Sequence, residues 1–123
     1  IIWHGWLNSN QLDEIAELSN FFIFGLENLG RQSHILPSKL QTYCMYGKPI
    51  ICFSGGAPRN LILKNKIGFV SENFNKKDMI KTYKIAINST HDERMTMSRN
   101  AINTFNNLFK SETTVKIFLN EIE

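Results

Sequence analysis

Residues 33–50 read SHILPSKLQTYCMYGKPI, and they follow an apolar run at 20–24. Pro37 suits the first position of a helix, where its missing N–H needs no partner. Gly47 suits the position that ends a helix, and a second apolar run follows at 49–53. The order strand, loop, helix, strand predicts a parallel β-α-β unit, because parallel neighbours require a helical crossover.

The same alternation continues along the chain and predicts an α/β fold. We expect strands at about 1–6, 20–24, 49–53 and 68–70, and a helix following each of them. Runs that are apolar on both faces indicate a parallel sheet covered by helices on both sides. The expected architecture is a single domain over 1–123, a Rossmann-like three-layer fold of about four strands with a helical C-terminal tail.

Capping signals and apolar spacing define the expected helices. Asn8, Thr90 with Glu93, and Ser111 provide N-terminal cap chemistry. Helices are also expected at 37–47 and 58–65. The apolar faces expected from helical spacing are Leu12/Ile15/Ala16, Met79/Ile80/Tyr83/Ile87, Met95/Ile102/Phe105/Phe109 and Val115/Phe118 or Leu119/Ile122.

Composition limits the classes of function. The chain has 123 residues, 42% of them hydrophobic, and a formal net charge of +3 with acids and bases mixed. A dedicated nucleic-acid binder normally concentrates its basic residues in a patch, whereas this balance is compatible with an anionic ligand or a membrane surface. The two cysteines, Cys44 and Cys52, lie in apolar runs without metal-ligand spacing, which argues for buried thiols in a reducing compartment and against a zinc site. The opening strand, without an initiator Met or a signal sequence, suggests a fragment of a longer protein.

Lys39 places a positive charge in the first turn of the helix predicted at 37–47. A cation in the first turn of a helix is disfavoured by the helix dipole. A bound anion, held by the free amides of the helix and by the Lys39 ammonium, would remove that cost, with Ser38 offering its hydroxyl and N–H. The alternative is a solvated surface lysine, and the local residues leave both open.

A second loop, Ser54-Gly55-Gly56, follows the next strand and is expected at the same sheet edge. Glycines permit positive φ and a close approach of the backbone to a ligand. A plain strand-to-helix turn explains them equally well. Two such loops on neighbouring strands favour a shared crevice for an anion or a nucleotide.

These residues resemble a known family. The pattern Pro37-Ser38-Lys39-Leu40-Gln41, then Tyr43, then Gly47-Lys48-Pro49-Ile50-Ile51 resembles a signature of bacterial GT-B-fold glycosyltransferases. The members that it resembles are the retaining, group 1 enzymes of lipopolysaccharide and capsule biosynthesis. Trp3-His4-Gly5, Ser54-Gly55-Gly56-Ala57 and Gly68-Phe69-Val70 extend the likeness over nearly the whole chain.

The resemblance implies a donor site for a nucleoside-diphosphate sugar, with UDP or GDP as the nucleotide and no further cofactor or metal. The family places two carboxylates eight positions apart around this helix start, and here those positions hold His34 and Thr42. Thr42 would bond a ribose hydroxyl without charge assistance, and His34 would contact the sugar or a phosphate oxygen. Each has an ordinary alternative, a loop histidine and a helix-surface threonine. The expected donor-binding residues are His34, Leu36, Pro37, Ser38, Lys39, Thr42, Ser54, Gly55 and Gly56.

The resemblance further implies that this chain is the C-terminal half of a GT-B fold. The intact enzyme would transfer a sugar to a glycan or lipid-linked acceptor held by the missing N-terminal domain, so the isolated chain is expected to be inactive and no catalytic residue is assigned. A cytoplasmic location follows, and peripheral association with the inner face of the membrane stays open. Two alternatives remain, a degenerate non-catalytic scaffold and one half of a nucleotide-sugar epimerase.

Overall fold

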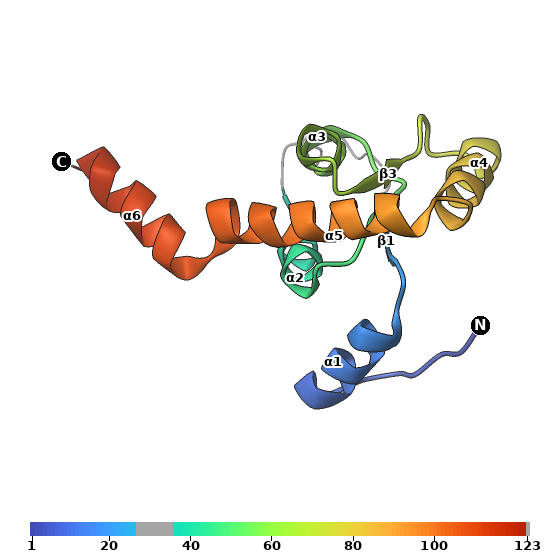
Figure 1. Cartoon of the computed structure of the whole chain (residues 1–123), viewed down its shortest axis with the longest axis horizontal. Coiled ribbons are helices and arrows are strands. Elements are labelled where there is room, and N and C mark those ends of the chain that lie inside the picture. Colours follow the sequence, from blue (N-terminus) through green and yellow to red (C-terminus); the bar gives the residue numbers. More distant parts are fainter. Residues whose placement is uncertain (27–35, 123) are drawn as a thin grey trace.

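The centre of the chain is a small parallel sheet. The computed structural model describes residues 1–26 and 36–122. Strands β1 (Phe22–Phe24), β2 (Ile50–Cys52) and β3 (Gly68–Val70) pair in parallel in the order β1-β2-β3. This topology confirms an α/β fold with a parallel sheet and is compatible with a Rossmann-like arrangement (Figure 1).

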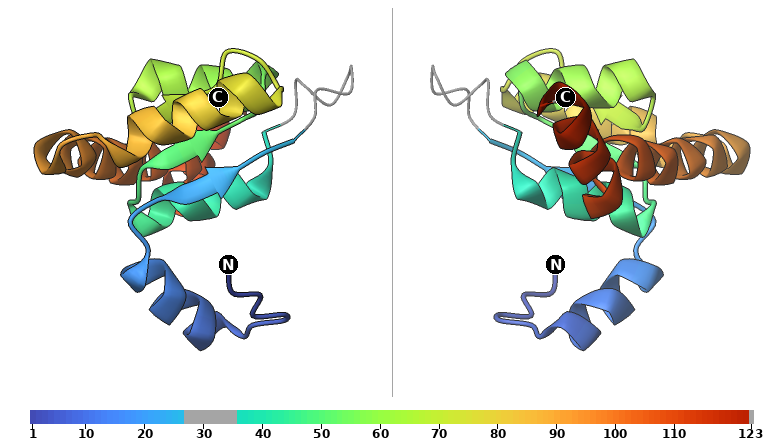
Figure 2. Two further views of the ribbon diagram at one scale, coloured as in Figure 1. Left: turned by 90° about the vertical axis from the view of Figure 1, so that its right-hand side faces the viewer. Right: turned by 90° about the vertical axis from the view of Figure 1, so that its left-hand side faces the viewer.

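Helices occupy most of the remaining described chain. Their bounds are α1 (Ser9–Leu18), α2 (Ser38–Tyr46), α3 (Gly56–Asn65), α4 (Lys76–Ile87), α5 (His91–Thr104), the π-helix η2 (Phe105–Phe109) and α6 (Ser111–Ile122). Helices α2 and α3 lie on one side of the sheet and α4 on the other, while α5 runs across α2 and α3 (Figures 1 and 2). Within the described residues, none of these helices combines the length and apolar character needed to cross a bilayer.

Several predicted helix ends are confirmed, but α3 begins at Gly56 rather than at Pro58, and Pro37 is the N-cap of α2 rather than its first residue. Asn8 forms a capping box with Gln11 at the start of α1, and Thr90 forms one with Glu93 at the start of α5. Gly47 ends α2 in the left-handed conformation at φ 68°, which glycine adopts without a steric penalty. Local chemistry therefore determines these boundaries.

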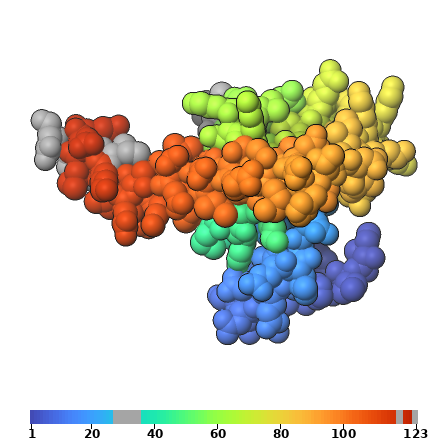
Figure 3. Space-filling model, in the orientation of Figure 1, coloured from blue at the N-terminus to red at the C-terminus, as the bar shows by residue number. Residues whose placement is uncertain are grey.

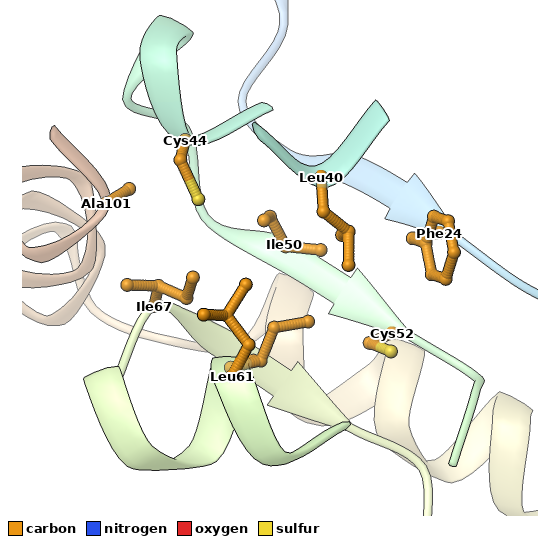
Figure 4. Close-up of a cluster of buried hydrophobic side chains, with 9 residues drawn as sticks. Phe24, Leu40, Cys44, Ile50, Cys52, Leu61, Ile67 and Ala101 are labelled. Atoms are coloured by element: carbon orange, nitrogen blue, oxygen red, sulfur yellow. The ribbon is translucent and has the colours of Figure 1, made fainter. Parts of the chain in front are cut away.

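The core lies between the sheet and the pair α2 and α3. All three residues of β2 are buried, as expected for a central strand. The buried side chains that surround the strand on this side are Phe24, Leu40, Cys44, Leu61, Ile62, Ile67 and Ala101 (Figure 4). The ring of Phe22 packs on Tyr43 of α2 with centroids 4.5 Å apart, which places Phe22 on the same side.

The predicted first strand is wrong. Residues 1–6 are not a strand, and Ile1, Trp3 and Trp6 are exposed, so the sheet has three strands among the described residues rather than four. A strand needs a neighbour for its backbone groups and a core for its apolar face, and residues 1–6 have neither.

Helix α1 is joined to α2 by the Tyr46 hydroxyl, which donates a hydrogen bond to Asp13 Oδ1 at 2.5 Å.

The predicted apolar faces of two helices are also partly wrong. In α4 the buried residues are Thr82 and Ala86. Of the expected face, Met79 is half-buried, while Ile80, Tyr83 and Ile87 face solvent. In α5 the buried residues are Ala101 and Thr104, while Met95 and Ile102 are half exposed. Ile102 nevertheless covers Gly47 at the end of α2, where an added Cβ would lie 2.7 Å from its side chain.

The tail follows the prediction in its helical character but not in its packing. Phe105 and Phe109 pack against the core as expected, although they belong to η2 rather than to a continuous α-helix. Helix α6 begins at Ser111 and extends away from the body of the chain (Figure 1). Val115 and Leu119 of the expected face are exposed, and the side chains of Phe118 and Ile122 lie outside the described residues.

Burial of the two cysteines leads to a first prediction. Both thiols are free and buried, and burial raises the pKa of Cys44 to about 11 and also raises that of Cys52. Since the thiolate is the reactive form, a raised pKa leaves little of it at pH 8. We expect iodoacetamide to label the native chain at least about 100-fold more slowly than the chain in urea, as followed by mass spectrometry. Equal rates in the two conditions would contradict this packing.

Candidate functional site

Two helix N-termini lie at the carboxyl edge of the sheet. Helix α2 begins at Ser38 after β1, and α3 begins at Gly56 after β2. Their N-cap residues, Pro37 and Gly55, provide no side-chain hydrogen bond to the first turn, whereas Asn8, Asn75 and Thr90 cap α1, α4 and α5. Uncapped amides and the positive end of the helix dipole favour an anion.

The glycine loop suits close approach to the backbone. Gly55 is extended, with φ −89° and ψ −163°, and Gly56 has φ 64°. A positive φ of this kind is costly for residues with a Cβ. The first turn of α3 therefore presents the N–H groups of Gly56 and Ala57 without a side chain at Gly56 that would keep a ligand away.

Ser54 has a structural role that the sequence did not reveal. Its buried hydroxyl accepts from the Leu26 N–H at 2.5 Å and donates to the Leu26 carbonyl at 2.9 Å. These two bonds tie the chain after β1 to the chain after β2. The hydroxyl thereby holds the two loops together and has no free donor proton for a ligand.

Ser38, Lys39 and Thr42 line a hollow between α1 and α2. Its volume is about 510 Å³. The other residues around it are Leu12, Ile15, Ala16, Ser19, Phe22, Tyr43 and Tyr46. Apolar and aromatic walls with a few polar groups are typical of small-molecule sites. Burial raises the pKa of the Tyr43 phenol, which donates to the Ile23 carbonyl at 3.3 Å.

Thr42 is only weakly engaged inside its own helix. Its hydroxyl donates to the Ser38 carbonyl at 3.4 Å, one turn earlier and near the upper limit for a hydrogen bond. The spacing of Lys39 and Thr42 places them on the same face of α2, next to the hollow. A hydroxyl on that face can turn toward a ligand at little cost.

The structure does not bring the predicted donor residues to one hollow. Ser38, Lys39 and Thr42 line the first hollow and Leu36 lines a second, whereas neither of the two includes Pro37, Ser54, Gly55 or Gly56. Leu36 and Ala57 line a second hollow of about 760 Å³ between α3 and the α5–η2 segment. The N-termini of α2 and α3 share one edge of the sheet, but the side chains of Ser38, Lys39 and Thr42 are on the α1 side of α2. His34 lies outside the described residues.

Sequence reasoning missed the polar lining of this second hollow. Its amide side chains come from α3, α5 and η2, and Lys64 lies beside them. The amides are those of Asn60, Asn65, Asn100, Asn103 and Asn107. The spacing of the last three, at helical intervals, was a detectable signal. Asn65 and Asn100 donate to the Leu61 and Lys66 carbonyls at 2.9 and 3.0 Å, so part of the lining supports the fold.

Among the described residues, no three His, Cys, Asp or Glu side chains gather closely enough to hold a metal ion. Comparisons with protein-family models, with curated proteins and with solved structures find no match for this chain. The fold and the sheet edge therefore define an α/β protein with an anion-compatible edge, and the functional argument depends on the residues themselves.

Proposed function

We propose that this chain is the donor-binding domain of a glycosyltransferase that uses a nucleoside-diphosphate sugar. The observation that carries the proposal is the start of α2, where an uncapped N-terminus at the carboxyl edge of a parallel sheet has a lysine, Lys39, in its first turn. Open α/β sheets bind ligands at this edge. The resemblance of residues 37–51 to the glycosyltransferase signature supports the same assignment.

In the proposed binding mode, the diphosphate, the nucleoside and the sugar of the donor each contact a different part of this edge. The diphosphate lies against the N–H groups of Ser38 and Lys39, with the Lys39 ammonium as a counter-charge. The nucleoside occupies the hollow between α1 and α2, whose aromatic walls suit a base and whose Thr42 hydroxyl suits a ribose hydroxyl. Gly55 and Gly56 leave room for the sugar end.

Catalysis in this proposal is electrostatic. Donors fixed in place before the reaction stabilise the charge that develops on the departing diphosphate. The helix amides and Lys39 supply that stabilisation, and the acceptor is a surface glycan or a lipid-linked precursor. The resemblance favours retention of the anomeric configuration.

Titration with UDP, GDP and inorganic phosphate, followed by amide NMR shifts, tests this function. We expect one nucleotide to shift amides at 36–42 and 55–57 in a saturable manner. We expect Lys39→Gln to weaken binding about tenfold, because a charge-assisted contact is lost. Lys116→Gln is the matched control, since Lys116 is an exposed lysine outside both hollows.

Two results would count against the proposal. Shifts that scatter over the surface, or equal weakening by Lys39→Gln and Lys116→Gln, would show that the nucleotide binds only by general charge attraction. If the folded chain does not bind nucleotide at millimolar concentration, the result would favour a non-catalytic scaffold. Thr42 in place of a carboxylate is the observation that favours this second candidate.

A further inference from the structure

Helix α4 presents its large apolar side chains to solvent. The residues that it buries against the sheet are Thr82 and Ala86. On the outer side, Ile80, Tyr83 and Ile87 are 43%, 46% and 48% exposed. A surface helix normally shows the opposite pattern, with its large apolar residues toward the core. The small inner face is sufficient for packing on β2 and β3, so the outer apolar residues are not needed for the fold.

The same helix carries the whole positive excess of the chain. The sequence has 14 basic and 11 acidic residues, and α4 holds four of the lysines and one aspartate, so ten of each remain and cancel elsewhere. The one acid, Asp78, accepts from the Asn73 and Asn75 side-chain amides at 2.9 and 3.0 Å. All four lysines of α4 are exposed.

Helical spacing arranges these residues in two neighbouring stripes. Ile80, Tyr83 and Ile87 share one side of the helix with Lys76 at its N-terminal end, and Lys77, Lys81 and Lys84 share the adjacent side. Ile85, which is 52% exposed, lies beyond the lysines. Helix α4 lies at one end of the molecule, opposite the end that carries α6, with its outer side on the surface (Figures 1 and 3). The hollows beside α4 are lined by Lys81, Lys84 and Ile85 and not by the apolar stripe. An apolar stripe beside a lysine stripe suits an anionic surface.

We propose that α4 docks this protein on an anionic lipid bilayer. Ile80, Tyr83 and Ile87 enter the boundary between headgroups and acyl chains, where amphipathic helices bury their apolar face. The lysines extend along the interface and place their ammonium groups on lipid phosphates. The phenol of Tyr83 remains at headgroup level, where tyrosine is favoured. This inference does not depend on the donor site, because its residues line neither the hollow between α1 and α2 nor the first turns of α2 and α3.

Flotation of the chain with vesicles tests the proposal. Two kinds of vesicle serve as probes. The anionic vesicles contain phosphatidylcholine with about 30% phosphatidylglycerol, and the neutral vesicles contain phosphatidylcholine alone. We expect the chain to float with the first and not with the second, and 0.5 M NaCl, roughly three times physiological ionic strength, to release it.

Two variants and one control separate the contribution of the α4 lysines to membrane binding from that of its apolar side chains. Lys77→Gln/Lys81→Gln/Lys84→Gln is expected to lower partitioning about 100-fold, because each lysine near an anionic surface contributes roughly fivefold. Ile80→Ser/Ile87→Ser is expected to lower it at least about tenfold through the lost apolar contact. The control, Lys64→Gln/Lys110→Gln/Lys116→Gln, removes the same charge from exposed positions outside α4 and is expected to keep most of the binding.

Circular dichroism confirms that each variant retains its helices. Failure of the unmodified chain to float with anionic vesicles would overturn the proposal. An equal loss in the control and in the α4 lysine variant would overturn it as well, because binding would then depend on total charge rather than on α4. Nucleotide binding by the Ile80→Ser/Ile87→Ser variant should equal that of the unmodified chain, which keeps this test separate from the test of the donor site.

Discussion

Replacing Gly68 with alanine should remove several kcal/mol of stability. A Cβ on Gly68 would collide with the backbone of Ile50 in the neighbouring strand, far inside van der Waals contact. The atom that it meets is a carbonyl oxygen of the central strand, which cannot rotate away as a side chain can. We expect a cost of about 3 kcal/mol or more, and thermal unfolding should show a midpoint lowered by about 10 °C.

Gly25→Ala is the matched control for this prediction. A Cβ at Gly25 would have its nearest neighbour, a ring carbon of Phe53, at 3.7 Å, which is ordinary van der Waals contact. The same chemical change at the end of β1 should therefore alter stability by about 0.5 kcal/mol or less. Similar midpoints for the two variants would mean that β2 and β3 do not approach as closely as the structure shows.

Leu40→Ala is expected to have the second largest effect, about 2 to 5 kcal/mol. Leu40 is fully buried at 0% exposure and comes from the first turn of α2, next to the proposed phosphate site. Truncation leaves a cavity between α2 and β2, and the surrounding side chains fill such cavities only in part. Urea unfolding followed by circular dichroism measures the loss as a lower midpoint with an unchanged slope.

Leu63→Ala provides the comparison, since it makes the same substitution in a helix but on the surface. Leu63 lies in α3 and is 51% exposed, so we expect a change within about 0.5 kcal/mol. Loss of nucleotide binding in Leu40→Ala at temperatures where the variant stays folded would show that the position of the α2 N-terminus depends on this one packing contact. Equal unfolding midpoints for the two variants would contradict the assigned core.

Local signals predicted the middle of the chain well. Pro37, Gly47 and the apolar runs around them led to α2, β1 and β2, and the Thr90–Glu93 capping box led to α5. Each of these signals acts through neighbours within four residues along the chain. The location of Lys39 in the first turn of α2 is confirmed for the same reason, whereas its contact with a phosphate stays a prediction.

Burial was predicted less well than secondary structure. Helical spacing selected Ile80, Tyr83 and Ile87 as the inner face of α4, but the helix turns Thr82 and Ala86 to the sheet. The apolar pattern shows which residues share a face and not which face meets the core. Ser54 shows the same limit, because its bonds to Leu26 join residues 28 positions apart.

The sequence by itself determined the class of fold, the ends of α2, the starts of α1 and α5 and the lysine at the start of α2, because these depend on backbone preferences and on contacts within a single turn. Only the tertiary structure decided which strand-like segments pair, which helix faces are buried and which side of α2 its polar residues occupy. The physical reason is that pairing and burial depend on partners distant in the chain. A strand such as the one expected at 1–6 forms only where another strand satisfies its backbone groups.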